Sequence, residues 1–574
     1  MRMLAIGALA SLVVSTGFAQ DTATEAKLSG SALIDHWIKA KWDDAKLKPS
    51  ARASDAEWMR RAYLDIVGQI PSLEEAEKFL ADKNPRKREA LADSLVKDER
   101  YAEHWADVWS GIIVGFDKEK RAEGYRNEGS HDLRELLEKN LPYDEFARKI
   151  ITVEGWVPEG PAAMMMKPGE KTEEKPVGLA SYMVRQFREA GKDFPKALAG
   201  KLTRAFMGVQ IQCSQCHDHP FDKWTQEEFY GMASFFTEVK VRREPKDAAM
   251  KGYHVEDVVR GPVGRKLMGA GGADLSIPDS KTGPIKPSFI ETGKGAEAGT
   301  SRRASYAKYI TSPENLQFAK MCVNRYWAHF FGIGIVNPAD DFNGRNKPSH
   351  PELIAELAKD FIDHKFDLHW LIKAMAGSEA YSLTSRSVGK EPRDLQAEKL
   401  LAIARVRALA PEQILRSVVE AANLDEGPMM GMGRRDMAGK GPGAKAAKGA
   451  GKSEATNLLI MRLTAQFRNT FEDDEGGEAV EFAGTIPSAL MMMNSLVIAN
   501  GTTAGRMNGF GEMLAKHPSP EAKVRAIFLS CLSRPPSAGE HTRWISHVTK
   551  EQGLKGYEDL MWTLLNTSEF LFNH

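Results

Sequence analysis

Residues 195–236 have the sequence PKALAGKLTRAFMGVQIQCSQCHDHPFDKWTQEEFYGMASFF, which combines two helix patterns with a cysteine motif. Apolar residues recur at helical spacing up to Gly208, and glycine commonly ends a helix. Thr225 and Glu228 then have the spacing of a capping box, which opens a helix. We therefore predict two helices joined by a tight loop, with the cysteine motif of residues 213–217 in that loop.

The loop motif is Cys213-Ser214-Gln215-Cys216-His217, the Cys-x-x-Cys-His form by which haem is attached in c-type cytochromes. Two thiols three residues apart can add to the two vinyl groups of one haem, and the next histidine can then ligate the iron. The whole chain of 574 residues has 4 cysteines, so chance seldom produces this spacing. We predict one covalent haem c, with Cys213 and Cys216 as anchors and His217 as the proximal ligand.

Two other kinds of site use the same residues. Cys213, Cys216, His217 and His219 offer the thiolates and imidazoles of a structural zinc site. In an exported protein the two cysteines could instead form a disulfide. Either alternative would make the chain a non-redox scaffold or interaction protein. For the haem reading the sixth iron ligand is unassigned, and the candidates are Met232, His329 and His350, of which Met232 fits a helix core better.

The N-terminus predicts export. Residues Met1–Ala19 have a positive start, an apolar stretch and a small-residue cleavage site, as secretory signal peptides do. No later segment has the ~20 apolar residues of a membrane-spanning helix. Lys+Arg 78 balances Asp+Glu 78, which gives no bulk charge for nucleic acid or an anionic membrane. We expect a periplasmic or secreted protein that takes part in electron transfer or redox chemistry, does not bind nucleic acid, and has an unknown redox partner protein.

The rest of the chain predicts a mainly α, multi-helical fold with two helical domains, at residues 30–240 and 302–574. A Gly-, Pro- and Lys-rich connector over residues 241–301 is expected to hold short strands around Tyr253–Val259. A low-complexity insert at about residues 427–452 is expected to be disordered. Further helix starts are predicted at Ser72 with Glu75, at Ser312-Pro313 (a helix through Gly332) and at Ser349 with Glu352. Core packing is expected for Trp37, Trp42, Trp105 and Trp109.

Other reactive residues fit structural roles. Cys322 and Cys531 lie on apolar helix faces and are expected to be buried thiols. Asp340-Asp341 could be an acid–base pair, but a solvated or cap-forming turn fits better. The chain has no Ser-His-Asp signature, phosphate-binding glycine loop or nucleotide fingerprint. The sequence therefore assigns no enzymatic activity.

Longer strings resemble a known family. Residues 208–224 with Phe229-Tyr230-Gly231 resemble the signature of exported planctomycete cytochrome-like proteins that carry DUF1549. Three later strings resemble their usual partner, DUF1553: Val323–Trp327 with Phe331-Gly332; Asp340-Asp341-Phe342 before Ser349–Leu353; and Leu565–His574. The resemblance implies two domains in tandem and a cytochrome-like character, but no established biochemical role. Many relatives carry a further upstream haem motif, which this sequence lacks, so at most one haem is expected.

Overall fold

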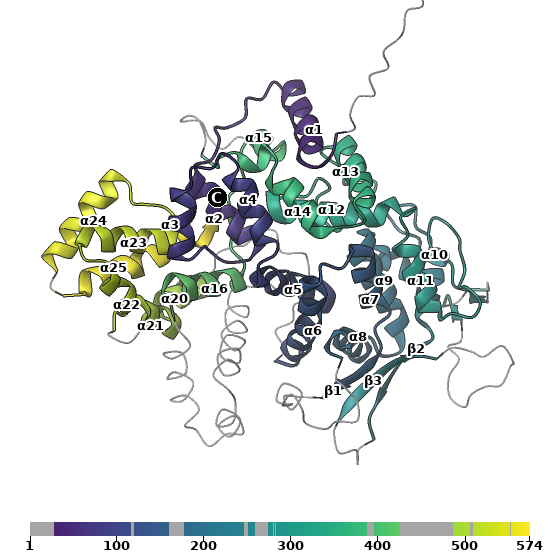
Figure 1. The fold of residues 1–574 in the computed structure, drawn as a ribbon. Helices are drawn as coiled ribbons and strands as arrows, with labels where there is room; N and C mark the ends of the chain where they lie inside the picture. Colours follow the sequence, from purple (N-terminus) through teal and green to yellow (C-terminus); the bar gives the residue numbers. More distant parts are fainter. Residues whose placement is uncertain are drawn as a thin grey trace, which may run out of the picture.

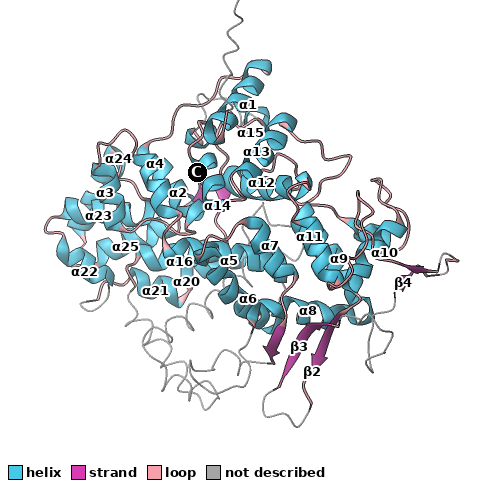
Figure 2. Ribbon diagram, turned by 45° about the vertical axis from the view of Figure 1, so that its right-hand side comes forward, coloured by secondary structure: helices cyan, strands magenta, loops and turns pink. Residues whose placement is uncertain are grey.

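The computed structural model describes most of the chain, and helices dominate the described part (Figures 1 and 2). The described residues are 28–115, 120–159, 177–245, 251–258, 274–278, 280–281, 283–386, 395–424, 486–505, 509–551 and 553–574. The predicted signal peptide and the predicted disordered insert lie outside these residues. The mainly α, multi-helical fold class is confirmed.

Residues before 240 form ten α-helices among the described residues, with short 3-10 turns between some of them. They are α1 (Gly30–Asp44), α2 (Asp55–Ile66), α3 (Leu73–Ala81), α4 (Lys87–Leu95), α5 (Glu99–Val114), α6 (Lys120–Glu138), α7 (Tyr143–Ile151), α8 (Ser181–Ala190), α9 (Phe194–Met207) and α10 (Gln226–Ala233). Both capping boxes predicted here are confirmed, at Ser72 with Glu75 and at Thr225 with Glu228. Each box satisfies backbone N–H groups that the first helical turn would otherwise leave without partners.

The strands of a small antiparallel sheet come after α7 and after α10 along the chain. Its strands are β1 (Gly155–Pro158), β3 (Gly252–Asp257) and β2 (Val239–Arg243), in that order across the sheet. Strand β3 lies where short strands are expected in the connector. In both views the sheet lies beside α8 at one edge of the molecule (Figures 1 and 2). Two further two-residue strands in this region, β4 (Leu275–Ser276) and β5 (Pro284–Ile285), pair with each other.

The later residues are again helical. The described helices are α11 (Arg302–Ile310), α12 (Leu316–Phe331), α13 (Pro351–Asp363), α14 (Leu368–Ala376), α15 (Leu395–Lys399), α16 (Pro411–Ala421), α20 (Ile486–Asn494), α21 (Leu496–Thr502), α22 (Gly509–Lys516), α23 (Pro520–Leu532), α24 (Ala538–Lys550), α25 (Lys555–Leu565) and α26 (Ser568–Leu571). Strands β6 (Arg407–Ala408) and β7 (Phe572–Asn573) pair, which brings the C-terminus back into the fold.

One predicted helix start and one predicted helix cap in this half are wrong. Helix α12 begins at Leu316, because residues 312–315 form turns rather than the first helical turn. Helix α13 does begin at Pro351, but Ser349 does not cap it. The Ser349 hydroxyl donates to Ile335 O at 3.2 Å and lies 2.9 Å from His350 Nδ1. The Ser349 side chain, which the local pattern assigns to the helix cap, instead makes a tertiary contact with Ile335.

The apolar core crosses the boundary between the two predicted domains. The larger core takes side chains from α1 to α10 and from α11 to α14, and it includes Trp42, Trp105 and Trp109 as expected. Trp105 stacks on Tyr326 of α12 with ring centroids 4.2 Å apart, and Tyr143 stacks on Phe318 at 4.7 Å. Aromatic pairs of this kind stabilise beyond the area they bury. The first and second halves of the chain therefore share one core.

A second core lies among α16 and α21 to α25. It also includes Leu64 and Ile70, from α2 and the turn after it. Figure 1 shows α23, α24 and α25 in yellow and α16 in green, with α3 beside α23. Among the helices that the structure describes, none is both long and apolar enough to cross a membrane.

Candidate functional site

Helix α9 precedes the cysteine motif and ends at Met207, with Gly208 after it as the sequence predicts. Gly208 adopts a left-handed conformation with φ 64°, and its N–H donates to Arg204 O at 3.0 Å. A Cβ at this position would lie 2.6 Å from Met321 Sδ and from Phe342 Cδ2. Glycine is therefore required here by both backbone conformation and close packing.

The motif begins as the 3-10 turn η4 (Ile211–Gln215). In a 3-10 helix side chains at i and i+3 lie on the same side, because one turn takes three residues. Ile211 and Ser214 share the inward side and are buried, whereas Cys213 and Cys216 are exposed. Both cysteines are free thiols in the structure. Cys213 within the turn and Cys216 directly after it are thus both exposed to solvent.

The loop after the thiols is held by its own hydrogen bonds. The carbonyl of Trp224 accepts from Ser214 Oγ at 3.2 Å and from the His219 N–H at 2.8 Å. The Asp218 carboxylate accepts from the Gln226 N–H at 2.8 Å, at the start of α10. Asp218 therefore links the loop to the first residue of α10.

The two histidines of the motif use their ring nitrogens differently. His217 Nδ1 lies 2.7 Å from Asp218 O. A carbonyl only accepts, so Nδ1 carries the proton and Nε2 keeps its lone pair free for a ligand bond. His219 Nδ1 instead accepts from the Phe221 N–H at 3.3 Å. The His219 Nδ1 lone pair is thus used within the loop, while His217 presents an available nitrogen from an exposed side chain.

No described part of the chain gathers three or more His, Cys, Asp or Glu side chains closely enough to hold a metal ion. The four donors considered for zinc, Cys213, Cys216, His217 and His219, are all described residues. Asp340 and Asp341 bind separate partners. Asp340 pairs with Arg204 at 2.5 Å, and Asp341 accepts from Asn346 Nδ2 at 2.9 Å. Asp340 is 4% exposed and forms an ion pair, so the expected solvated or cap-forming role is wrong for Asp340.

The candidates for a sixth iron ligand are held in the interior. Met232 is fully buried, and its Sδ accepts from the Ile290 N–H at 3.3 Å, which confirms its core role. His329 Nε2 lies 3.0 Å from Asp65 O and 3.4 Å from His104 Nε2. His350 is 1% exposed and contacts Ser349. Cys322 and Cys531 are buried as predicted, and burial raises the pKa of both thiols.

These buried histidines predict acid sensitivity. Burial lowers the pKa of His329 to about 3 and that of His350 to about 4, and it lowers the pKa of His104 well below its ordinary value. The unfolded chain binds protons near pH 6.5 whereas the folded chain does not, so stability falls as the pH drops below about 6.5. Between pH 7.5 and 5 we expect a loss of about 2 kcal/mol for each histidine that stays neutral.

Urea unfolding at pH 7.5 and pH 5 measures this loss. The window lies above the ordinary pKa of carboxylates, and burial raises the pKa of Asp65 and Glu420, whose protonation would oppose the loss caused by the histidines. A His350→Gln variant should show a smaller difference between the two pH values than the wild-type chain does. Equal unfolding free energies at both pH values in the wild-type chain would refute the prediction.

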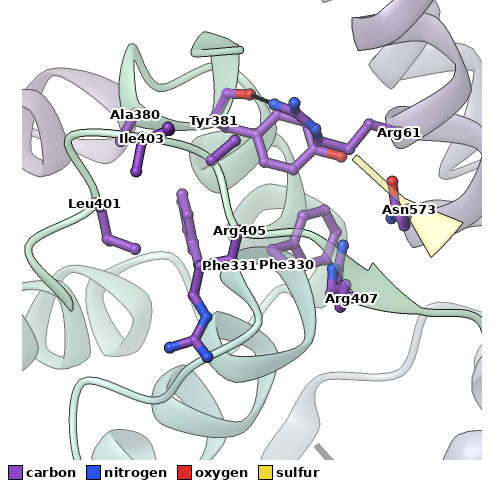
Figure 3. A pocket seen from close by; sticks show the side chains of 11 residues that line it. Arg61, Phe330, Phe331, Ala380, Tyr381, Leu401, Ile403, Arg405, Arg407 and Asn573 are labelled. Atoms are coloured by element: carbon purple, nitrogen blue, oxygen red, sulfur yellow. Dashed lines mark hydrogen bonds between the residues drawn. The ribbon is translucent and has the colours of Figure 1, made fainter. Parts of the chain in front are cut away.

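A buried ionic cluster, which the sequence analysis does not predict, lies away from the motif. Asp65 of α2 is 1% exposed; its carboxylate pairs with Arg407 and accepts from Tyr381 Oη and Asn573 Nδ2, each at 2.7 Å. Arg61 lies beside it and donates to Tyr381 O at 2.5 Å. A cavity of about 20 Å³ is lined by Arg61, Tyr381, Arg407 and Asn573 together with apolar side chains. Figure 3 shows these lining side chains. This volume suits one water molecule.

Comparison with known families gives two matches. Residues 33–241 match the model PSCyt2, a protein of unknown function (DUF1549), and residues 302–548 match PSD1, a protein of unknown function (DUF1553). No curated protein and no solved structure gives a significant match to the chain. The cysteine motif lies in the first matched region, and α12 and α13 lie in the second. The chain therefore carries matches to the DUF1549 and DUF1553 families in tandem.

Proposed function

We propose that the chain is an exported, single-haem, c-type-cytochrome-like protein that transfers electrons in the periplasm. The observation that carries the proposal is the arrangement of the motif. Cys213 lies in a 3-10 turn and Cys216 directly follows that turn; both thiols are free and exposed, and His217 next to them presents its Nε2 lone pair. This donor set matches what covalent haem attachment requires.

The residues of the loop supply the three groups that covalent haem attachment uses. Cys213 and Cys216 would form the thioether bonds, and His217 would ligate the iron. The Asp218 carbonyl holds the proton on His217 Nδ1, and a hydrogen bond of this kind fixes the tautomer and raises the basicity of a ligating imidazole. When bound, a c-type haem supplies reversible one-electron exchange.

Export supports the same proposal. Residues Met1–Ala19 have the pattern of a secretory signal, and haem attachment to this motif follows export in bacteria. The resemblance to exported planctomycete cytochrome-like proteins rests on residues 208–224, which include the motif. Localisation in the periplasm or secretion, a haem c cofactor and an external redox partner protein are parts of this one proposal.

The proposed electron transfer is tested by a reduced-minus-oxidised absorption spectrum of the mature protein, exported by a host with c-type haem maturation machinery. We expect a c-type difference band that titrates reversibly as one electron. A His217→Ala variant should keep the cysteines but change the spectrum, because the proximal ligand is lost. A protein without reversible redox absorbance, from a host that matures a control cytochrome, would contradict the proposal and favour the disulfide or zinc alternative.

A further inference from the structure

The C-terminal end of α9, which leads into the cysteine loop, is held by the second matched region. Its carbonyl groups at Ala205, Met207 and Gly208 accept hydrogen bonds from outside the helix. The donors are Arg325 Nη1 at 2.5 Å, Gln317 Nε2 at 2.7 Å and the Phe342 N–H at 2.7 Å. The last carbonyls of a helix have no partner within the helix, so these bonds satisfy groups that would otherwise need water.

Side chains before and after the cysteine loop also contact residues of the second matched region. Before it, Arg204 pairs with Asp340 at 2.5 Å, and Asp340 is 4% exposed. After it, the guanidinium carbon of Arg345 lies 3.5 Å from the ring centroid of Phe221. Phe221 is 52% exposed, and this cation–π contact joins its ring to the second matched region.

Residues 317–345, which make these contacts, are held by hydrogen bonds of their own. Asn324 of α12 is fully buried; its Nδ2 donates to Val336 O and Ala339 O, each at 2.8 Å, and its Oδ1 accepts from the Val336 N–H at 2.9 Å. Further along, Asn343 Oδ1 accepts from the Arg345 N–H at 2.8 Å. A buried side-chain amide with several bonds fixes the loop that follows α12. The 317–345 segment therefore has a defined shape against which α9 and the cysteine loop are placed.

We infer that the 317–345 segment positions the Cys213–His217 loop, and that this is a role of the second matched region toward the first. The strings at residues 323–327 and 340–342, for which the proposed function gives no role, supply Asn324, Arg325, Asp340 and Phe342 to this arrangement. The segment lies in the second region and its targets in the first. The inference concerns the site of the proposed function, but the contacts that carry it do not require haem.

Hydrogen exchange of the full mature chain tests the inference. The reporters are amides in residues 208–226, where the N–H groups of Gly208, His219 and Gln226 are hydrogen-bonded. Gln317→Leu removes the donor to Met207 O, and Arg345→Ala removes the cation above Phe221. Gln317→Leu should raise exchange in residues 208–226 by about fivefold, the factor for losing one ordinary hydrogen bond, and Arg345→Ala by about two- to fivefold, the factor for an exposed cation–π contact, while α23 keeps its wild-type exchange.

Two matched variants distinguish loss of the Arg345–Phe221 contact from a general loss of structure. Arg345→Lys keeps a cation over Phe221 and should restore most of the wild-type protection. Lys347→Ala removes an exposed charge from the same loop and should leave exchange unchanged. Wild-type exchange in both Gln317→Leu and Arg345→Ala, or an equal rise in α23, would overturn the inference. Because exchange is measured with or without haem, this result is independent of whether the proposed function holds.

Discussion

Replacing Asp65 with alanine is expected to lower the free energy of unfolding by about 3–5 kcal/mol. The carboxylate is buried and accepts from Tyr381, Asn573 and Arg407. Its removal would leave the Arg407 guanidinium without its carboxylate in a largely buried site, and it would leave two polar side chains unpaired. Removing one member of a buried ion pair costs far more than the pair itself contributes, because the remaining charge stays desolvated.

Urea unfolding of Asp65→Ala measures this effect. Asp144→Ala is the control, since Asp144 forms an i,i+4 pair with Arg148 at 2.9 Å on a partly exposed helix face. Such pairs contribute about 0.3–0.5 kcal/mol. A loss for Asp65→Ala no larger than that of the control would show that the cluster does not hold α2, β6 and the C-terminus together.

Separating the two matched regions is expected to abolish cooperative folding of the first. Residues 28–301 alone would lose Phe318 and Tyr326, which stack on Tyr143 and Trp105 in the shared core. They would also lose the hydrogen bonds that Gln317 and Arg325 donate to the end of α9. Exposing this many large aromatic side chains leaves too little buried apolar area to offset the entropy of ordering the chain.

Near-ultraviolet circular dichroism and urea unfolding of residues 28–301 test this expectation. We expect a weak near-ultraviolet signal and no cooperative transition. Co-expression with residues 302–574 should restore both, because the two segments rebuild the shared core. A cooperative transition in the isolated first segment would mean that the two regions are independent domains.

Local patterns in the sequence predict the local structure well. The capping boxes at Ser72 and Thr225 and the glycine stop at Gly208 are all found, because each depends on residues within one helical turn. The same reasoning fails at Ser349, where Ile335 competes for the hydroxyl. A local rule gives the right answer only while no distant group binds the same atom.

In the candidate site, too, local features are visible in the sequence and contacts between distant residues are not. The Cys-x-x-Cys-His motif is visible in the sequence, and the structure adds that both thiols face solvent and that His217 keeps Nε2 free. The Asp65 cluster has no sequence pattern, because Tyr381 and Asn573 follow it by more than 300 residues. Arg345 over Phe221 also joins distant segments. Pairings of this kind follow from the fold and have no local signature.

The central claim is that Cys213 and Cys216 carry one covalent haem. The most direct measurement is the intact mass of the mature protein after denaturation, exported by a host with c-type haem maturation machinery. The account predicts the added mass of a single haem in the wild-type chain and in Cys322→Ser, whose thiol is buried, and no added mass in the Cys213→Ser, Cys216→Ser double variant. A wild-type chain without that mass, from a host that loads a control cytochrome, would contradict it.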